Sequence, residues 1–164
     1  MSSFDDVNYR WRETYFVFLR SADRPTVEDL QKLFGRLKKQ FELADVKGDE
    51  VGRLETARVL APSANVAIDI SFVEGEEVIE QIKLLREEFK AMADTPEEQL
   101  KLTRIRQCDS RLDVLHFQRM DESAYFDEED MDELIDPGAL LTVMERLAKL
   151  CDGVGFDPAA SSVL

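Results

Sequence analysis

Histidine and cysteine are scarce in this sequence. His116 is the only histidine, and Cys108 and Cys151 lie far apart with no Cys-x-x-Cys spacing. A di-iron carboxylate bundle needs two Glu-x-x-His motifs, and a catalytic zinc site built on two or three histidines needs more of them than this chain has. Two isolated cysteines are typical of free thiols in a reducing compartment. The shortage excludes these metal centres, predicts no cofactor, and favours the cytoplasm.

Long apolar runs and glycine-rich motifs are also missing. No stretch approaches the roughly 18 apolar residues of a membrane span, and the N-terminus has no basic region typical of a signal peptide. Neither a Walker A sequence nor Gly-x-Ser-x-Gly occurs. "DGVGFD" at residues 152–157 contains Gly-x-Gly, but it follows a predicted helix and lacks the third glycine of a dinucleotide fingerprint. The usual signatures of nucleotide and serine hydrolysis are therefore absent.

Basic residues are outnumbered by acidic ones, 21 against 35, which gives a net charge of -14. Nucleic acids and anionic membranes attract proteins through Lys and Arg, so we expect neither as a partner. Nine acids and no bases occur between residues 121 and 136, which leaves only -5 for the rest of the chain. The excess charge is thus mostly local.

Length and composition predict one α+β domain over residues 1–164, since 164 residues of which 44% are hydrophobic can bury a sizeable core. We expect residues 1–8 and 158–164 to be loose ends and residues 121–136 to be an acidic connecting segment. Alternation of apolar residues predicts strands, and three- to four-residue spacing predicts helices. The strands expected are residues 9–19, 41–47, 53–61, 66–73 and 111–118, and the helices are residues 26–40, 76–92, 95–107 and a last one that begins at Asp136-Pro137 and ends before Gly153 as its C′ residue.

This order, without the short helix at 95–107, is the β-α-β-β-α-β pattern of ferredoxin-like folds. It predicts a four-stranded antiparallel sheet with both main helices on one face. The added C-terminal helix has an apolar stripe that must pack over a sheet edge, on the free sheet face, or against a second subunit.

The C-terminal sequence "LAKLCDGVGFDPAASSVL" combines a helix, a glycine stop, a short apolar run and Asp-Pro. It resembles the ends of some uncharacterised bacterial proteins over about eighteen residues. No activity is known for them, so the resemblance implies none here.

The acidic stretch "YFDEEDMDELIDPG" at residues 125–138 raises the question of a cation site. An EF-hand loop needs glycine at its sixth position and glutamate at its twelfth, but a loop from Asp121 has Phe126 and Asp132 there. A loop from Asp127 fails in the same way, so a hydrated connection is favoured over a weak divalent-cation site. Apolar residues among the acids also make the stretch a candidate partner-binding segment, with Tyr125, Phe126, Asp127, Glu128, Glu129, Asp130, Met131 and Asp132 as its residues.

Four polar residues in predicted strands are weak catalytic candidates: Asp69, Asp113, Glu13 and His116. In the ferredoxin-like strand order, Asp69 and Asp113 would lie two strands apart with Glu13 between them. A shared sheet face would make them a carboxylate site, but the polar side of an antiparallel sheet explains them as well. His116 shares a side with Leu112 and Val114 and is more simply a core histidine than a catalyst. Both cysteines read as structural rather than nucleophilic.

The sequence therefore favours a non-enzymatic intracellular protein-interaction module, with a homodimer as one form. A small-molecule or metal-dependent enzyme built on the dispersed carboxylates is the first alternative. Weak divalent-cation binding by the acidic segment is the second.

Overall fold

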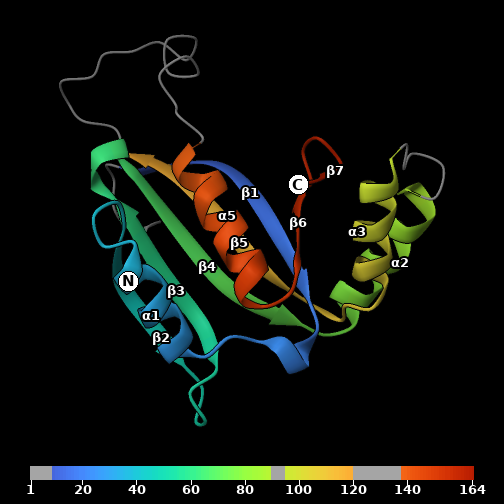
Figure 1. The fold of residues 1–164 in the computed structure, drawn as a ribbon, viewed down its shortest axis with the longest axis horizontal. Helices are drawn as coiled ribbons and strands as arrows, with labels where there is room; N and C mark the ends of the chain where they lie inside the picture. Colours follow the sequence, from blue (N-terminus) through green and yellow to red (C-terminus); the bar gives the residue numbers. More distant parts are fainter. Residues whose placement is uncertain (1–8, 90–94, 120–137) are drawn as a thin grey trace.

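The computed structural model describes residues 9–89, 95–119 and 138–164 (Figure 1). In the described part of the chain, strands form a single sheet and helices lie against it. The strands are β1 (Tyr9–Leu19), β2 (Glu42–Gly48), β3 (Leu54–Ala61), β4 (Val66–Glu74), β5 (Ser110–Arg119), β6 (Val154–Asp157) and β7 (Ser162–Val163). The helices are α1 (Val27–Arg36), α2 (Glu76–Phe89), α3 (Pro96–Arg106) and α5 (Gly138–Leu150), with short 3-10 turns η2 (Ser21–Asp23) and η3 (Pro62–Ala64).

The sheet has seven strands in the order β2-β3-β4-β5-β1-β6-β7, and every neighbouring pair is antiparallel. The ferredoxin-like prediction is therefore wrong, although the broad α+β class is right. Short turns make β2, β3 and β4 a meander, and the α2–α3 pair returns the chain so that β5 pairs directly with β4. β1 then pairs with β5 on one side and with β6 on the other.

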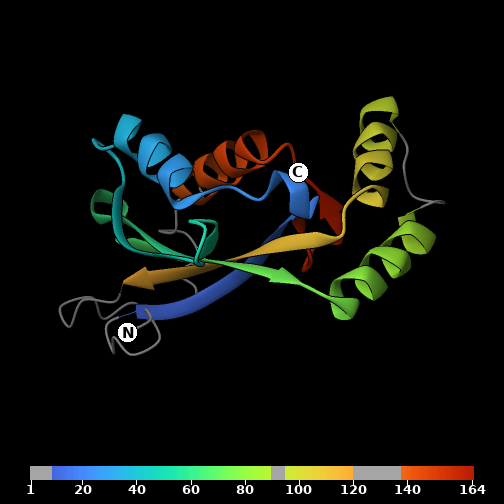
Figure 2. The ribbon, with the colours of Figure 1, turned by 90° about the horizontal axis from the view of Figure 1, so that it is seen from below.

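The helices lie on different sides of the sheet, which corrects the expectation of both main helices on one face. Figure 2 shows α1 and α5 over one face, whereas α2 and α3 stand at one end of the sheet. α1 and α5 pack in one apolar cluster with Tyr15, Val17 and Leu19, whereas α2 packs in a second cluster with Phe18. Since successive strand residues point to opposite faces, Phe18 lies on the face opposite Val17 and Leu19. We call the face under α1 and α5 the covered face.

The opposite side we call the outer face. Strand register places seven polar or half-buried side chains together there. They are Thr14, Thr56, Arg58, Asp69, Ser71, Asp113 and Leu115.

Helix starts follow local sequence closely. Thr26 caps α1: its Oγ1 accepts from the Asp29 N–H at 3.0 Å, and Asp29 Oδ2 accepts from the Thr26 N–H at 3.0 Å. This is a capping box, which satisfies two otherwise unpaired backbone donors. Thr95 caps α3 in the same way, by accepting from the Glu98 N–H at 3.1 Å, and Pro96 takes the first helical position.

The end of α5 differs from the expectation that Gly153 would be its C′ residue. Asp152 has that conformation, with φ 51°, and the Gly153 N–H donates to the Ala148 carbonyl at 2.8 Å. Gly153 is needed for another reason, because a Cβ atom on it would lie 2.5 Å from the Phe18 carbonyl oxygen. The missing side chain lets the chain turn directly into β6 beside β1.

The segment after β6 was expected to be a loose end. Instead, β7 pairs with β6, the Leu164 N–H donates to the Gly155 carbonyl at 2.9 Å, and Lys101 Nζ donates to the Leu164 carbonyl oxygen at 2.5 Å. These contacts hold residues 162–164 against both the sheet and α3.

Candidate functional site

Glu13 and His116 face each other across β1 and β5 on the covered face. A register shift between Trp11 and Glu13 adds one residue to β1 and aims Glu13 at the imidazole. His116 Nδ1 lies 3.3 Å from Glu13 Oε1, and His116 is fully buried while 38% of the Glu13 side chain is exposed. The prediction that His116 belongs to the core, beside Leu112 and Val114, is confirmed.

The environment of His116 favours the neutral imidazole. Burial lowers the pKa of His116, and the charge and hydrogen bond of Glu13 oppose this only in part. Nε2 is buried and has no hydrogen-bond partner in the described structure. A general base must reach a proton on its substrate, and the buried Nε2 offers no contact with solvent for that purpose.

Tyr15, which the sequence did not single out, completes this cluster. Burial, followed by the negative charges of Glu13 and Asp157, raises the pKa of Tyr15 to about 12. The phenol therefore stays protonated at neutral pH and donates a hydrogen bond to the Glu13 carboxylate. The cluster is a hydrogen-bonded part of the covered face rather than an open acid–base site.

Asp69 lies on the outer face, in a row that runs across three strands. Arg58 on β3 stands between Asp69 on β4 and Asp45 on β2, with N–O distances of 3.3 and 3.9 Å. Arg58 and Asp69 are mostly buried, whereas the Asp45 side chain is exposed. This arrangement neutralises Asp69, as a buried carboxylate requires.

Asp113 lies on the same face and also has its own arginine. Arg111, two residues earlier on β5, places Nε 2.7 Å from Asp113 Oδ1 and donates from a second nitrogen to Gln81 on α2 at 2.5 Å. Its guanidinium also lies 4.7 Å from the centre of the Phe16 ring. Arg111 therefore links Asp113 on β5 to Gln81 on α2.

The four candidate residues do not converge. Asp69 and Asp113 are diagonal neighbours on adjacent strands, because Asp69 pairs with Leu115 and Asp113 with Ser71. Glu13 and His116 lie on the opposite face of the sheet. The expected separation of Asp69 and Asp113 by β1 is thus wrong, since β4 and β5 are neighbours and β1 lies beyond β5.

The acidic segment, including Tyr125, Phe126, Asp127, Glu128, Glu129, Asp130, Met131 and Asp132, lies outside the described residues. Among the residues that are described, no group of three or more His, Cys, Asp or Glu side chains could hold a metal ion.

The two thiols are free and suppressed as nucleophiles. Burial raises the pKa of Cys108 to about 11 and that of Cys151 to about 12. Thiolates are the reactive form of cysteine, so both thiols are almost entirely unreactive at neutral pH.

Two surface features escaped the sequence reasoning. Trp11 is 56% exposed on the outer face, opposite Phe117, and its Nε1 donates to Thr14 Oγ1 at 3.1 Å. The second is a cavity between α2 and α3 lined by Lys83, Arg86, Glu87 and Arg106. Basic residues late in a helix, such as Lys83 and Arg86, are explained by the helix dipole alone, and the sequence of α2 does not show which helix packs beside it.

No family model matches the chain, and neither a curated protein nor a solved structure matches it. None of the described helices is both long enough and apolar enough to cross a membrane.

Proposed function

We propose that this chain is a non-enzymatic protein-binding module, and that its contact surface is the outer face beside Trp11. The exposed indole supports this most directly. Tryptophan is enriched among residues that dominate binding energy, because it offers a large apolar area at little conformational cost. At 56% exposure, Trp11 leaves more than half of its surface available to a partner.

The surroundings of Trp11 fit the rim of a protein interface. The outer face mixes half-buried apolar residues such as Leu115 with hydroxyls and the ion-paired Asp69 and Asp113. Interfaces of this kind combine an apolar centre with paired polar groups around it. The enzyme alternative has less support, because its candidate carboxylates are paired with arginines and Glu13 and His116 lie on the other face.

The charge of the chain favours a basic partner, and the exposed Trp11 allows a second copy as the alternative. Net charge is -14, and opposite charge accelerates association and fixes orientation more than it adds affinity. Free thiols at Cys108 and Cys151 suit a reducing compartment, so we place the module in the cytoplasm.

The test uses Trp11 as its own reporter, since it is the only tryptophan. If two copies associate through this face, sedimentation gives a dimer and the fluorescence emission of Trp11 shifts to shorter wavelength as protein concentration rises. Trp11→Ala should then sediment as a monomer. Val51→Ala removes another exposed apolar side chain, on the β2–β3 turn, and should leave association unchanged.

If the wild-type protein sediments as a monomer, the next experiment is a search for a basic protein that binds it. Crosslinked affinity purification should then recover a basic protein with the wild type and with Val51→Ala, but not with Trp11→Ala. A strict monomer that captures no basic protein, or capture that is equal for all three proteins, contradicts the proposal.

A further inference from the structure

An open cavity of about 430 Å³, with exposed side chains along its described lining, lies between α2 and α3. These two helices stand at one end of the sheet in Figure 2. Its described lining consists of three basic side chains and one acidic one: Lys83 and Arg86 from α2, Arg106 from α3, and Glu87. Two helices that meet at one cavity thus bring cations from separate parts of the chain together.

These cations are poorly neutralised by the protein itself. Within the described part of the chain, neither Arg86 nor Arg106 takes part in an ion pair, although the protein has an excess of acids. Lys83 Nζ lies 3.7 Å from Glu80 Oε1, but both side chains are exposed, and such pairs contribute little. The cavity therefore has a local positive charge that Glu87 offsets only in part.

A purely structural role accounts for part of this pattern. Arg86 and Arg106 are in the last turns of their helices, where cations interact favourably with the helix dipole. That effect requires no particular direction of the side chains around the helix. It does not account for the convergence of Arg86, Arg106 and Lys83 on the same cavity.

We propose that this cavity binds a small polyanion, a molecule with at least two phosphate or carboxylate groups. Arginine presents a planar fork of donors that matches both groups, and lysine adds a point charge. The volume falls within the range of roughly 300 to 1,000 Å³ found for small-molecule pockets, which favours a small ligand over a peptide strand. Because three of the four described lining side chains are basic, an anionic ligand complements the cavity.

The charge of Glu87 should affect anion affinity in the opposite sense to the three basic side chains. Its carboxylate repels an anion in the same cavity, so removal of its charge should strengthen binding rather than weaken it. Phosphate and carboxylate groups would be bound by the same arginine and lysine side chains. One probe of each kind therefore distinguishes a phosphorylated ligand from a polycarboxylate.

The experiment is calorimetric titration of the full chain at low ionic strength with pyrophosphate and, separately, with citrate. We expect saturable binding of one probe per chain, weakened about tenfold by Arg86→Ala and by Arg106→Ala. Tighter binding of pyrophosphate assigns a phosphorylated ligand, and tighter binding of citrate assigns a polycarboxylate. Glu87→Gln should tighten binding about threefold, and added salt should weaken it.

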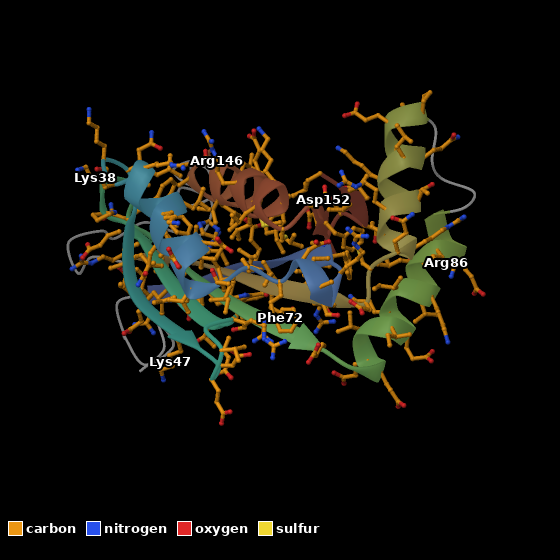
Figure 3. All side chains as sticks on the ribbon, turned by 60° about the horizontal axis from the view of Figure 1, so that its bottom comes forward. Lys38, Lys47, Phe72, Arg86, Arg146 and Asp152 are labelled. Carbon is orange, nitrogen blue, oxygen red and sulfur yellow. The ribbon has the colours of Figure 1, made fainter. Side chains whose placement is uncertain are left out.

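Arg146→Ala is the matched control, because it changes net charge equally at an exposed arginine on α5, distant from Arg86 in Figure 3. It should alter affinity by less than about twofold. Circular dichroism verifies that each variant is folded. The proposal is overturned if neither probe gives saturable binding, or if Arg146→Ala weakens binding as much as Arg86→Ala does.

Discussion

His116 is a buried titratable side chain that folding leaves with an unpaired polar atom, Nε2, in the described part of the chain. An unsatisfied buried group costs about 1 to 3 kcal/mol, and a charged one costs more. The neutral form is tolerated because Glu13 engages Nδ1. Protonation would place a cation inside the sheet, where the partially exposed Glu13 carboxylate attracts it and the charge of Arg12 repels it.

This gives a pH dependence of definite sign. Burial lowers the pKa of His116 in the folded state, so below about pH 6.5 the unfolded chain binds more protons at this residue than the folded chain. The free energy of unfolding should therefore fall as pH drops from 7.5 to about 5.5, with a contribution from this residue of up to about 1.4 kcal/mol per pH unit. Urea denaturation at a series of pH values measures it.

Two variants isolate the histidine. His116→Leu and His116→Gln both remove the titrating group, and both should flatten the pH dependence over this window, whatever their stability at pH 7.5. A pH dependence as steep in both variants as in the wild type would assign the effect to other groups.

We expect substitution of alanine for glycine to have opposite effects on stability at Gly153 and at Gly35. A Cβ on Gly153 meets the backbone oxygen of Phe18 at 2.5 Å and Val17 Cγ1 at 2.9 Å, so Gly153→Ala should destabilise the protein by about 1 to 3 kcal/mol. Gly35 in α1 has nothing within 4 Å of such an atom, so Gly35→Ala should stabilise by about 0.5 to 1 kcal/mol. Thermal unfolding of the two variants distinguishes these outcomes. Equal effects of the two substitutions would contradict the close approach of β6 to β1.

At the scale of elements, the capping box of α1 connects local sequence to the core. Thr26→Ala removes the acceptor of the Asp29 N–H and should lower the free energy of unfolding by about 1 kcal/mol. Leu30 and Phe34 on α1 are buried in the larger core, so fraying of this helix affects global unfolding, which chemical denaturation reports.

Thr95→Ala is the comparison. Thr95 caps α3 with a similar bond, but α3 buries only Ile105. Its loss should change local helicity more than global stability. A larger global effect for Thr95→Ala than for Thr26→Ala would contradict this ranking.

The elements themselves were largely predictable, because their signals are local. Val66, Ile68 and Ile70 alternate as a strand with one buried face, and the Thr26 and Thr95 caps mark helix starts where the structure has them. β6 was missed because four residues, with Val154 and Phe156 as its only apolar alternation on one side, are too few to establish a period.

The assembly of the elements was not predictable by the same reasoning. Strand order depends on which residues pair across long separations, such as Phe16 with Phe156 and Ile68 with His116, and no local pattern encodes these pairs. The element order suited a ferredoxin-like sheet equally well. A β-hairpin meander from β2 to β4 and the addition of β6 beyond β1 decided against it.

The candidate site was likewise predictable only in part. The residue types were visible, and the core position of His116 followed from alternation. The partners were not visible: Arg58 lies on another strand than Asp69, and Arg111 bridges Asp113 to Gln81 on α2. A carboxylate in a strand is thus a catalytic candidate from sequence alone, because only the structure shows the arginine that neutralises it.

For the whole molecule, the two apolar clusters are unequal. The larger one joins α1, α5 and the covered faces of β1, β3, β4 and β5, whereas the smaller one joins α2, α3 and β6 around Phe18. In α3 only Ile105 is buried, and its other contacts include exposed polar pairs such as Arg104 with Asp152. Elements with few buried apolar contacts open locally at lower free energy than the core.

Native-state hydrogen exchange should therefore separate the molecule into two levels. Amides of β4 and β5 should exchange only through global unfolding, because both strands are paired on both sides and bury Ile68, Ile70, Leu112 and Val114. Amides of α3 should exchange through a local opening, faster at every denaturant concentration below the unfolding transition. If the cavity between α2 and α3 binds pyrophosphate or citrate, that ligand should slow exchange in α3 while leaving β4 and β5 unchanged, since it stabilises only the state in which both helices are in place. Exchange of α3 at the same rate as β5, with and without the ligand, would show that the helical pair unfolds together with the sheet, and would contradict the separation into two levels.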